Sequence, residues 1–337
     1  MSDFRIDKIT NRDGSAGTQI AGISTFSGTS GMIMPGGATA YRGGRGRGLV
    51  FGGGWPFKKS IDYVTIATTG NAADFGDMET TGGQLGACAS STRAVHGGQA
   101  TPSGTNYMGY VTISSNGGTS DFGELTDEDN LYERQAGGNE VRGMFWGGGT
   151  PATTNRKYNS AINIASTGDS YDWGDLQNPT GGNRVSISSP TRSVICSYAN
   201  DDSRRNVIEY ITISTYGSAA DFGAVDGSYP NAERSGSSNS TRGIFAGNWN
   251  PGGTNVINYI TIATTGDGTD FGDLLTASNQ ASSMSSSTRC IVNALGGTNV
   301  MQYITITSTG NAADFGDLTG TRQQSGATSD CHGGLAQ

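Results

Sequence analysis

The chain has 337 residues, of which 55 are glycine, 34% are hydrophobic and 15% are charged. The low charge excludes the usual composition of a disordered chain, while the many Gly, Ser, Thr and Asn residues favour short strands joined by tight turns. The formal net charge of −8 argues against nucleic acid as a partner, because phosphate recognition needs clustered Lys and Arg.

Residues 1–42 form a leader that lacks the repeat found in the rest of the chain. Its apolar residues are too sparse for a core, and we expect them to dock on another protein; a tail without fixed structure is the alternative. These candidate docking residues are Phe4, Ile6, Ile9, Ile20, Ile23 and Phe26. No apolar secretory signal and no run of 18 apolar residues occurs, so no membrane insertion is expected. Residues 43–48 read Gly-Gly-Arg-Gly-Arg-Gly, which predicts a hinge rather than an RNA-binding motif.

The rest of the chain carries six copies of the triplet Asp-aromatic-Gly. The aromatic residues of the six copies are Phe75, Phe122, Trp173, Phe222, Phe271 and Phe315. They lie 47, 51, 49, 49 and 44 residues apart. A period near 48 residues fits a four-stranded propeller blade and is too long for one helix pair of the common helical arrays.

A strongly strand-forming stretch precedes each triplet. Five copies read Tyr-(Val/Ile)-Thr-Ile, at residues 63–66, 110–113, 210–213, 259–262 and 303–306, and the third copy reads Ala-Ile-Asn-Ile at 161–164. Both faces of these strands carry apolar residues, so each strand is predicted to be covered on both sides. A turn with Gly followed by Asn or Asp, as at Gly70 and Gly266, supplies the positive φ that a tight hairpin needs.

Two further features recur in phase with the triplet. An apolar strand ends in paired glycines at residues 52–53, 97–98, 147–148 and 296–297; the fifth copy keeps only Gly247, and the fourth has none. Just before each of these strands stands an arginine: Arg47, Arg93, Arg142, Arg192, Arg242 and Arg289. Because arginine and the triplet Asp both occur once per unit, we expect them to pair as bidentate salt bridges that fix the blade spacing.

This order of strands, glycine pairs, Tyr and aromatic resembles the kelch repeat. The resemblance covers residues 45–334 and implies an all-β fold, a six-bladed kelch-like β-propeller (residues 43–337) behind the leader (residues 1–42). The unit departs from kelch blades in the missing glycines of the fourth copy and in Phe where Trp is usual. C-terminal strand material is expected to complete the first blade and close the ring, although an open solenoid is the alternative. A seventh glycine pair, residues 333–334, has no place in six blades.

The leader and the repeat also resemble structural proteins of tailed phages, especially those that infect marine cyanobacteria. The residues that carry this resemblance are Ile-Asp-Lys-Ile-Thr-Asn-Arg-Asp-Gly at 6–14, Gly-Ile-Ser-Thr-Phe-Ser-Gly-Thr-Ser-Gly at 22–31 and the repeated Tyr-Ile-Thr-Ile and Asp-Phe-Gly-Asp-Leu stretches. The resemblance implies a virion location, after assembly in the host cytoplasm.

Motifs with catalytic associations have structural explanations in this chain. The kinase triplet Asp-Phe-Gly occurs without the kinase phosphate loop or catalytic loop, and residues 166–173 do not match a sialidase Asp-box. His96 and His332 share one strand phase, but two imidazoles without a third ligand are a weak metal site. The four cysteines are too far apart for a disulfide framework or a zinc motif, so neither metal nor cofactor is expected.

We therefore expect a non-enzymatic virion protein, a tail or fibre appendage whose leader docks on the particle. Its propeller would contact other virion proteins or a host-surface glycan or protein, within a homo- or hetero-oligomeric assembly. A capsid decoration protein is one alternative. A carbohydrate-binding or carbohydrate-cleaving propeller is another. The cleaving enzyme requires several acids that converge in one pocket, whereas the acids of this chain are spread through the repeats.

Overall fold

The computed structural model describes residues 25–27, 31–33, 46–54, 56–100, 105–126, 134–148, 156–180, 185–196, 207–225, 234–248 and 253–335. The chain divides into two compact units, Met1–Arg42 with Gln337, and Gly43–Ala336. In the first unit, β1 (Thr25–Ser27) and β2 (Gly31–Ile33) form an antiparallel pair. No helix among the described residues combines the length and the apolar character needed to cross a bilayer.

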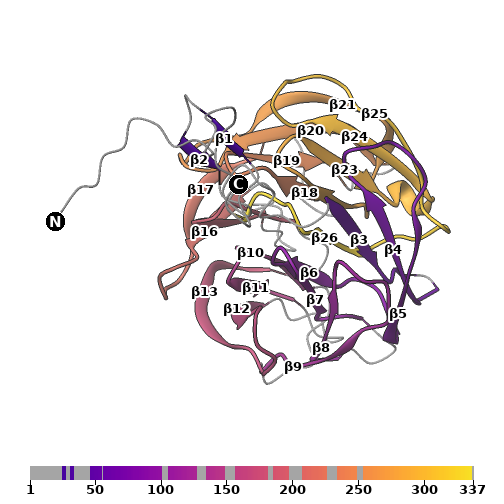
Figure 1. The fold of residues 1–337 in the computed structure, drawn as a ribbon. Coiled ribbons are helices and arrows are strands. Elements are labelled where there is room, and N and C mark those ends of the chain that lie inside the picture. Colours follow the sequence, from indigo (N-terminus) through magenta and orange to yellow (C-terminus); the bar gives the residue numbers. More distant parts are fainter. Residues whose placement is uncertain are drawn as a thin grey trace, which may run out of the picture. The chain divides into compact units, whose positions relative to one another are not determined.

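In the second unit, the described residues form six four-stranded antiparallel sheets arranged as the blades of a β-propeller (Figure 1). From the axis outward, blade 1 contains β26 (Gly326–Ser329), β3 (Arg47–Phe51), β4 (Lys58–Thr65) and β5 (Ala73–Gly82). Blade 2 contains β6 (Gly86–Ala89), β7 (Arg93–Gly97), β8 (Tyr107–Thr112) and β9 (Ser120–Glu124). Blade 3 contains β10 (Gln135–Gly138), β11 (Arg142–Trp146), β12 (Arg156–Asn163) and β13 (Tyr171–Thr180).

The remaining three blades follow the same order from the axis outward. Blade 4 contains β14 (Val185–Ser188), β15 (Arg192–Cys196), β16 (Val207–Thr212) and β17 (Ala220–Ala224). Blade 5 contains β18 (Ser235–Ser238), β19 (Arg242–Ala246), β20 (Thr254–Thr261) and β21 (Thr269–Ser278). Blade 6 contains β22 (Ser282–Ser285), β23 (Arg289–Asn293), β24 (Val300–Thr305) and β25 (Ala313–Asp317), with the short 3-10 helix η2 (Leu295–Gly297) between β23 and β24.

The predicted six-bladed propeller and its closure are confirmed. The inner strand of blade 1 is β26, which pairs with β3 from Gly326 opposite Phe51 to Ser329 opposite Gly48. In Figure 1 the yellow β26 and the indigo β3 accordingly lie side by side. The inner strands of neighbouring blades also lie next to one another all the way around the axis. An open solenoid is therefore excluded.

The apolar core lies between the blades rather than in one central mass. Six buried clusters occur, one at each junction of neighbouring blades; the cluster of blades 1 and 2, for example, contains Leu49, Phe51 and Phe75 from one blade and Val111 and Ile113 from the next. The strand-forming Tyr-Ile-Thr-Ile stretches have buried apolar residues on both faces because each blade packs against two neighbours.

Two faces of the ring are distinguished by the direction of the inner strands. We call the face where these strands begin the Gln face, because Gln84, Gln280 and Gln324 stand there, and the opposite face the turn face, because it carries the Gly-Asn and Gly-Asp turns. The outer hairpins alternate in length. In blades 1, 3 and 5 the two outer strands have 8 and 10 residues, and in blades 2, 4 and 6 they have 6 and 5.

Candidate functional site: the blade seams and the central channel

The triplet aromatic residues lie at the seams, which we define as the contacts between an outer strand and the Gly turn of the next blade. At each seam the turn glycine donates its N–H to the aromatic residue's carbonyl, as Gly117 does to Phe75 at 2.8 Å and Gly70 to Phe315 at 2.8 Å. A second bond follows two residues further on, as from Ala72 N–H to the Asp317 carbonyl at 2.8 Å. The pair of bonds recurs at all six junctions, including the one that closes the ring.

The triplet glycine is required by the closeness of this approach. Gly316 has a φ of 137°, and a Cβ there would lie 2.5 Å from the carbonyl oxygen of Gly70. The turn residue after the glycine adds a side-chain contact: the Asn71 Oδ1 accepts the Asp317 N–H at 3.0 Å. Asp169, Asp267 and Asn311 accept equivalent bonds in their own turns. The Gly-Asn and Gly-Asp signatures thus join blades as well as forming hairpins.

The six phased arginines stack on aromatic rings, and the expected pairing with the triplet Asp residues is wrong. In five blades the guanidinium carbon lies 4.3–4.5 Å from the centroid of the strand Tyr, and this Tyr meets the triplet Phe edge-on. Each Nη1 then donates to a carbonyl of the next blade, as Arg242 does to Ile306 at 2.9 Å. Among the described residues, none of these six arginines forms an ion pair with a triplet Asp.

The reason for this difference is strand alternation. Neighbouring residues of a strand face opposite sides, so a buried triplet aromatic requires an outward Asp. Phe271 is 2% exposed, whereas Asp270 beside it is exposed. The arginine lies on the buried side with the rings and cannot reach the carboxylate.

Blade 3 solves the same packing problem with different residues. Its strand has Ala161 where the other blades have Tyr (Tyr63, Tyr110, Tyr210, Tyr259 and Tyr303), and its triplet has Trp173 instead of Phe. Arg142 stacks directly on Trp173, with its guanidinium carbon 3.8 Å from the ring centroid. The larger Trp ring thus takes the place of the strand Tyr in the stack on the arginine, which explains why both departures occur in the same blade.

A second set of buried polar residues was not found from the sequence. It stands one position before the strand Tyr or its blade 3 equivalent, and comprises Asp62, Ser160, Glu209, Asn258 and Gln302. Asp62 forms an ion pair with Arg322 at 2.8 Å, both side chains being 1% exposed. Glu209 accepts the N–H groups of Gln177 and Asn178 from blade 3, and burial raises its pKa. A lone acidic residue inside a strand of Ile and Tyr is the signal that could have revealed Asp62 and Glu209.

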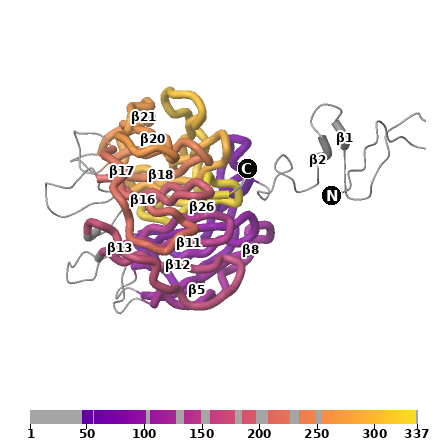
Figure 2. Tube along the Cα trace, turned by 90° about the vertical axis from the view of Figure 1, so that its left-hand side faces the viewer, coloured from indigo at the N-terminus to yellow at the C-terminus, as the bar shows by residue number. Residues whose placement is uncertain are grey.

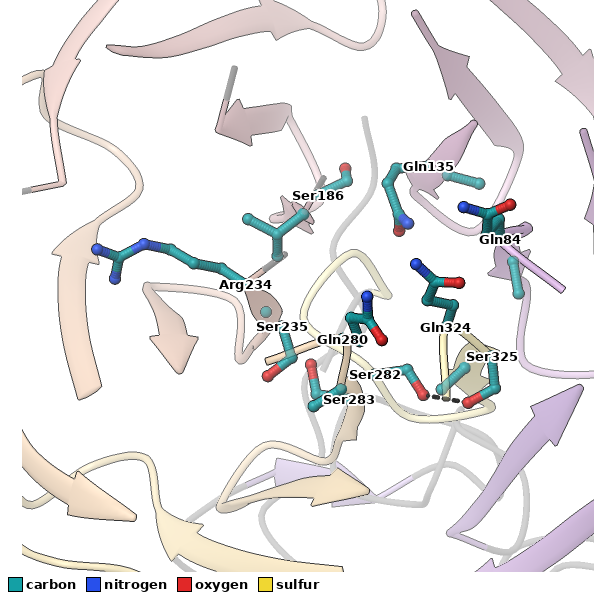
Figure 3. Close-up of a pocket in the computed structure, with 16 residues that line it drawn as sticks. Gln84, Gln135, Ser186, Arg234, Ser235, Gln280, Ser282, Ser283, Gln324 and Ser325 are labelled. Carbon is teal, nitrogen blue, oxygen red and sulfur yellow. Dashed lines mark hydrogen bonds between the residues drawn. The ribbon is translucent and has the colours of Figure 1, made fainter. Parts of the chain in front are cut away.

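The six inner strands surround a central channel with polar, mostly uncharged walls. At the Gln face it forms a pocket lined by amides and hydroxyls from several blades, among them Gln84, Gln135, Gln280, Gln324 and Ser283 (Figure 3). The centres of water-sized spheres can occupy a volume of about 50 Å³ in this pocket. Since one water needs roughly 10–15 Å³ of such space, the pocket has room for a few waters.

Residues 332–335, which we call the plug, close the channel at the turn face, and this explains the seventh glycine pair. His332 donates its Nε2 proton to the Ala89 carbonyl at 2.8 Å, and its Nδ1 accepts the Gly334 N–H at 3.0 Å. Gly333 donates to the Ser238 carbonyl at 2.8 Å. A Cβ on Gly333 or Gly334 would collide with backbone carbonyl oxygens of the inner strands. Figure 2 shows the yellow C-terminal chain crossing the middle of the unit between the orange and the indigo blades.

The two histidines have separate surroundings. His96 lies between the rings of Phe51 and Tyr107, and its burial lowers its pKa to about 4. His332 belongs to the plug, where burial also lowers its pKa. Within the described ranges, no three His, Cys, Asp or Glu side chains come together as a metal-binding group. Cys88 and Cys290 are buried thiols whose pKa rises to about 12.

Two sequence predictions concern residues that the structure does not fully describe. The docking candidates Phe4, Ile6, Ile9, Ile20 and Ile23 lie outside the described residues, and of Phe26 only the backbone, in β1, is described. The predicted hinge at residues 43–48 is wrong at its end, because Arg47 and Gly48 already belong to β3. Arg47 and Gly48 are extended because they pair with β4, and Gly48 also pairs with β26.

The comparisons with known proteins give no family. No protein-family model matches the chain, and no curated protein matches it.

Proposed function

We propose that the protein is a non-enzymatic structural component of a tailed-phage particle, in which the leader docks on the virion and the propeller contacts other proteins or the host surface. The propeller fold suits such an interaction role. The virion assignment is supported by the resemblance of the leader and of the Tyr-Ile-Thr-Ile and Asp-Phe-Gly-Asp-Leu stretches to phage structural proteins.

The observation that carries the interaction role is how the repeated residues are used. Triplet aromatics, triplet glycines, turn residues and phased arginines all hold one blade to the next, and the plug fills one end of the channel. Such a ring is a rigid support that leaves its rims and outer wall available for contacts. Among the described residues that line the channel pocket none is acidic, which favours a binding protein over a carbohydrate-cleaving one.

The location can be tested on purified phage particles. We expect peptides of this chain at a fixed ratio to the major tail proteins in mass spectrometry, and gold-labelled antibody on the tail or its fibres. Label on the head would favour the alternative of a capsid decoration protein. Particles that contain all other tail proteins but lack this chain would overturn the virion assignment.

Docking through the leader has a separate test in the full chain. Replacing Ile6 and Ile9 with Asp should abolish incorporation into particles, since a charged side chain is costly in an apolar contact. The thermal unfolding of the propeller should stay the same, because residues 1–42 belong to a separate unit. Normal incorporation of this variant would contradict leader docking. A glycan array and a polysaccharide hydrolysis assay with the unaltered protein address the carbohydrate alternative.

A further inference from the structure

The junction of blades 3 and 4 on the turn face departs from the repeat at neighbouring positions. Tyr171 stands before the triplet Asp, where the other blades have Ala73, Ser120, Ala220, Thr269 and Ala313. Tyr216 stands before the turn glycine, where the other blades have Thr69, Asn116, Thr167, Thr265 and Thr309. Together with Trp173, these two tyrosines form what we call the aromatic patch.

The rings of the aromatic patch touch one another and are held in place. The centroid of Trp173 lies 5.9 Å from that of Tyr171 and 5.8 Å from that of Tyr216, in edge-on contacts. The Tyr171 hydroxyl accepts the Arg142 Nε–H at 3.3 Å, and the Tyr216 hydroxyl donates to Asp172 Oδ2 at 3.0 Å. Fixed aromatic side chains lose little conformational entropy when they bind a partner.

Packing within the propeller does not explain Tyr216, whereas Tyr171 lies opposite Ala161 and takes part of the space of the Tyr missing from that strand. The triplet Phe residues of the other blades are 2% exposed although only Ala, Ser, Thr or Asn stands at the two neighbouring positions. Tyr171 is 41% exposed and Tyr216 is 63% exposed. With Val141, which precedes Arg142 at 59% exposure, they are three of the four large hydrophobic residues that the described structure leaves exposed. Clusters of Tyr, Trp and Arg of this kind are typical of binding hot spots.

The charges around Tyr216 indicate the chemistry of the partner. Asp172 and Asp175 are both exposed, and the hydrogen bond to Asp172, followed by the negative charges of both carboxylates, raises the pKa of the Tyr216 hydroxyl. An aromatic ring beside carboxylates attracts a cation both through the ring quadrupole and through the carboxylate charge. The propeller uses this contact internally, since arginine stacks on tyrosine in five blades.

We propose that the aromatic patch binds a basic segment of a partner protein, with a Lys or Arg side chain on the Tyr216 ring beside Asp172 and Asp175. This inference rests on the proposed interaction role and names the surface and the class of partner. It is tested by a binding measurement that is independent of the virion assignment, so failure of one does not imply failure of the other.

The test uses the full-length protein and a fluorescent hexa-arginine peptide, with binding followed by fluorescence anisotropy. The double variant Tyr171→Ala/Tyr216→Thr takes the residues that the repeat itself uses at these positions, and it keeps the net charge. We expect its peptide affinity to fall about fivefold or more, the combined effect of losing cation–π contacts to two rings. The control Thr265→Ala, at the position of blade 5 equivalent to Tyr216, should bind like the unaltered protein.

Two outcomes would overturn the proposal. An unchanged affinity of the double variant would mean that the peptide binds through exposed carboxylates alone, without the rings. A glycan that binds the unaltered protein but not the double variant, together with unchanged peptide affinity, would assign the patch to sugar recognition.

If the double variant unfolds at a lower temperature, the single change Tyr216→Thr, at the more exposed position, is measured in its place. This single change should lower the peptide affinity about threefold.

Discussion

Replacing Arg242 with Ala tests the stacking arrangement that the six arginines share. Arg242 lies 4.3 Å from the Tyr259 ring centroid and donates from Nη1 to the Ile306 carbonyl at 2.9 Å. A hydrogen bond that involves a charged group contributes about 1.5–3 kcal/mol, and a cation–π contact about 0.5–1 kcal/mol at exposed sites. Since Arg242 is only half-buried, we take the lower ends of these ranges and expect a loss of about 2 kcal/mol.

The free energy of unfolding is measured by urea titration with far-ultraviolet circular dichroism. Asp270→Ala is the matched control, because Asp270 is the exposed triplet Asp of the same blade and forms no ion pair with Arg242. This control should change the unfolding free energy by less than about 0.5 kcal/mol. In double-mutant cycles, Arg242 should couple to Tyr259, tested as Tyr259→Leu, and not to Asp270.

Two results would refute this reasoning. One is a loss below about 0.5 kcal/mol for Arg242→Ala, which would mean that the stack and the interblade hydrogen bond contribute little. The other is a coupling of Arg242 to Asp270 that exceeds its coupling to Tyr259, which would restore the salt bridge expected from the sequence.

Three further predictions concern the seam, the buried histidine and the plug. Gly316→Ala should cost about 2–4 kcal/mol of unfolding free energy, since the new Cβ meets the neighbouring blade, whereas Gly310→Ala, with open space around its Cβ and a φ of 156°, should cost only about 1 kcal/mol. His96→Val should remove an acid-dependent loss of stability. Burial lowers the folded-state pKa of His96 to about 4, below the ordinary histidine value of about 6.5, so stability is full above pH 6.5 and falls by about 3 kcal/mol as the pH drops towards 4. Removal of residues 332–337 should lower the unfolding free energy by about 1–3 kcal/mol, because it deletes the hydrogen bonds of the plug to the Ala89 and Ser238 carbonyls.

Each of these expectations has a result that contradicts it. Equal losses for the two glycine variants would show that backbone conformation, and not the close approach of blades, decides the cost. An unchanged pH profile in His96→Val would assign the acid sensitivity to other groups, such as His332. An unchanged unfolding free energy after removal of residues 332–337 would show that the plug does not stabilise the ring.

The propeller architecture could be predicted because every copy of the repeat meets the same packing requirement. In every Asp-aromatic-Gly copy a buried ring stands beside a glycine that the next blade approaches closely. The six copies therefore give six independent indications of the same blade structure. Closure followed from the strand material after the last triplet, which the structure shows as β26. Local signals and the overall fold agree, as expected for a chain whose landscape favours one state.

The details that failed depend on distances between blades, which a period cannot supply. The period placed Arg242 and Asp270 in the same unit, but only strand alternation shows that they face opposite sides. The glycine pair at 333–334 looked like one more strand end, because its role as a plug exists only after the ring has formed. The partners of Asp62 and Glu209 lie in neighbouring blades, so no spacing within a unit could reveal them.

Because β26 pairs with β3, blade 1 can be completed only after the C-terminal residues have been synthesised. Residues 326–329 leave the ribosome only after all six outer hairpins have been made, so a nascent or prematurely terminated chain holds five complete blades and one with a bare β3 edge. Such an edge readily pairs with other molecules and promotes aggregation. Ring closure is therefore one of the last steps of folding. A chain that ends before β26 differs from the finished protein by the unpaired edge of β3.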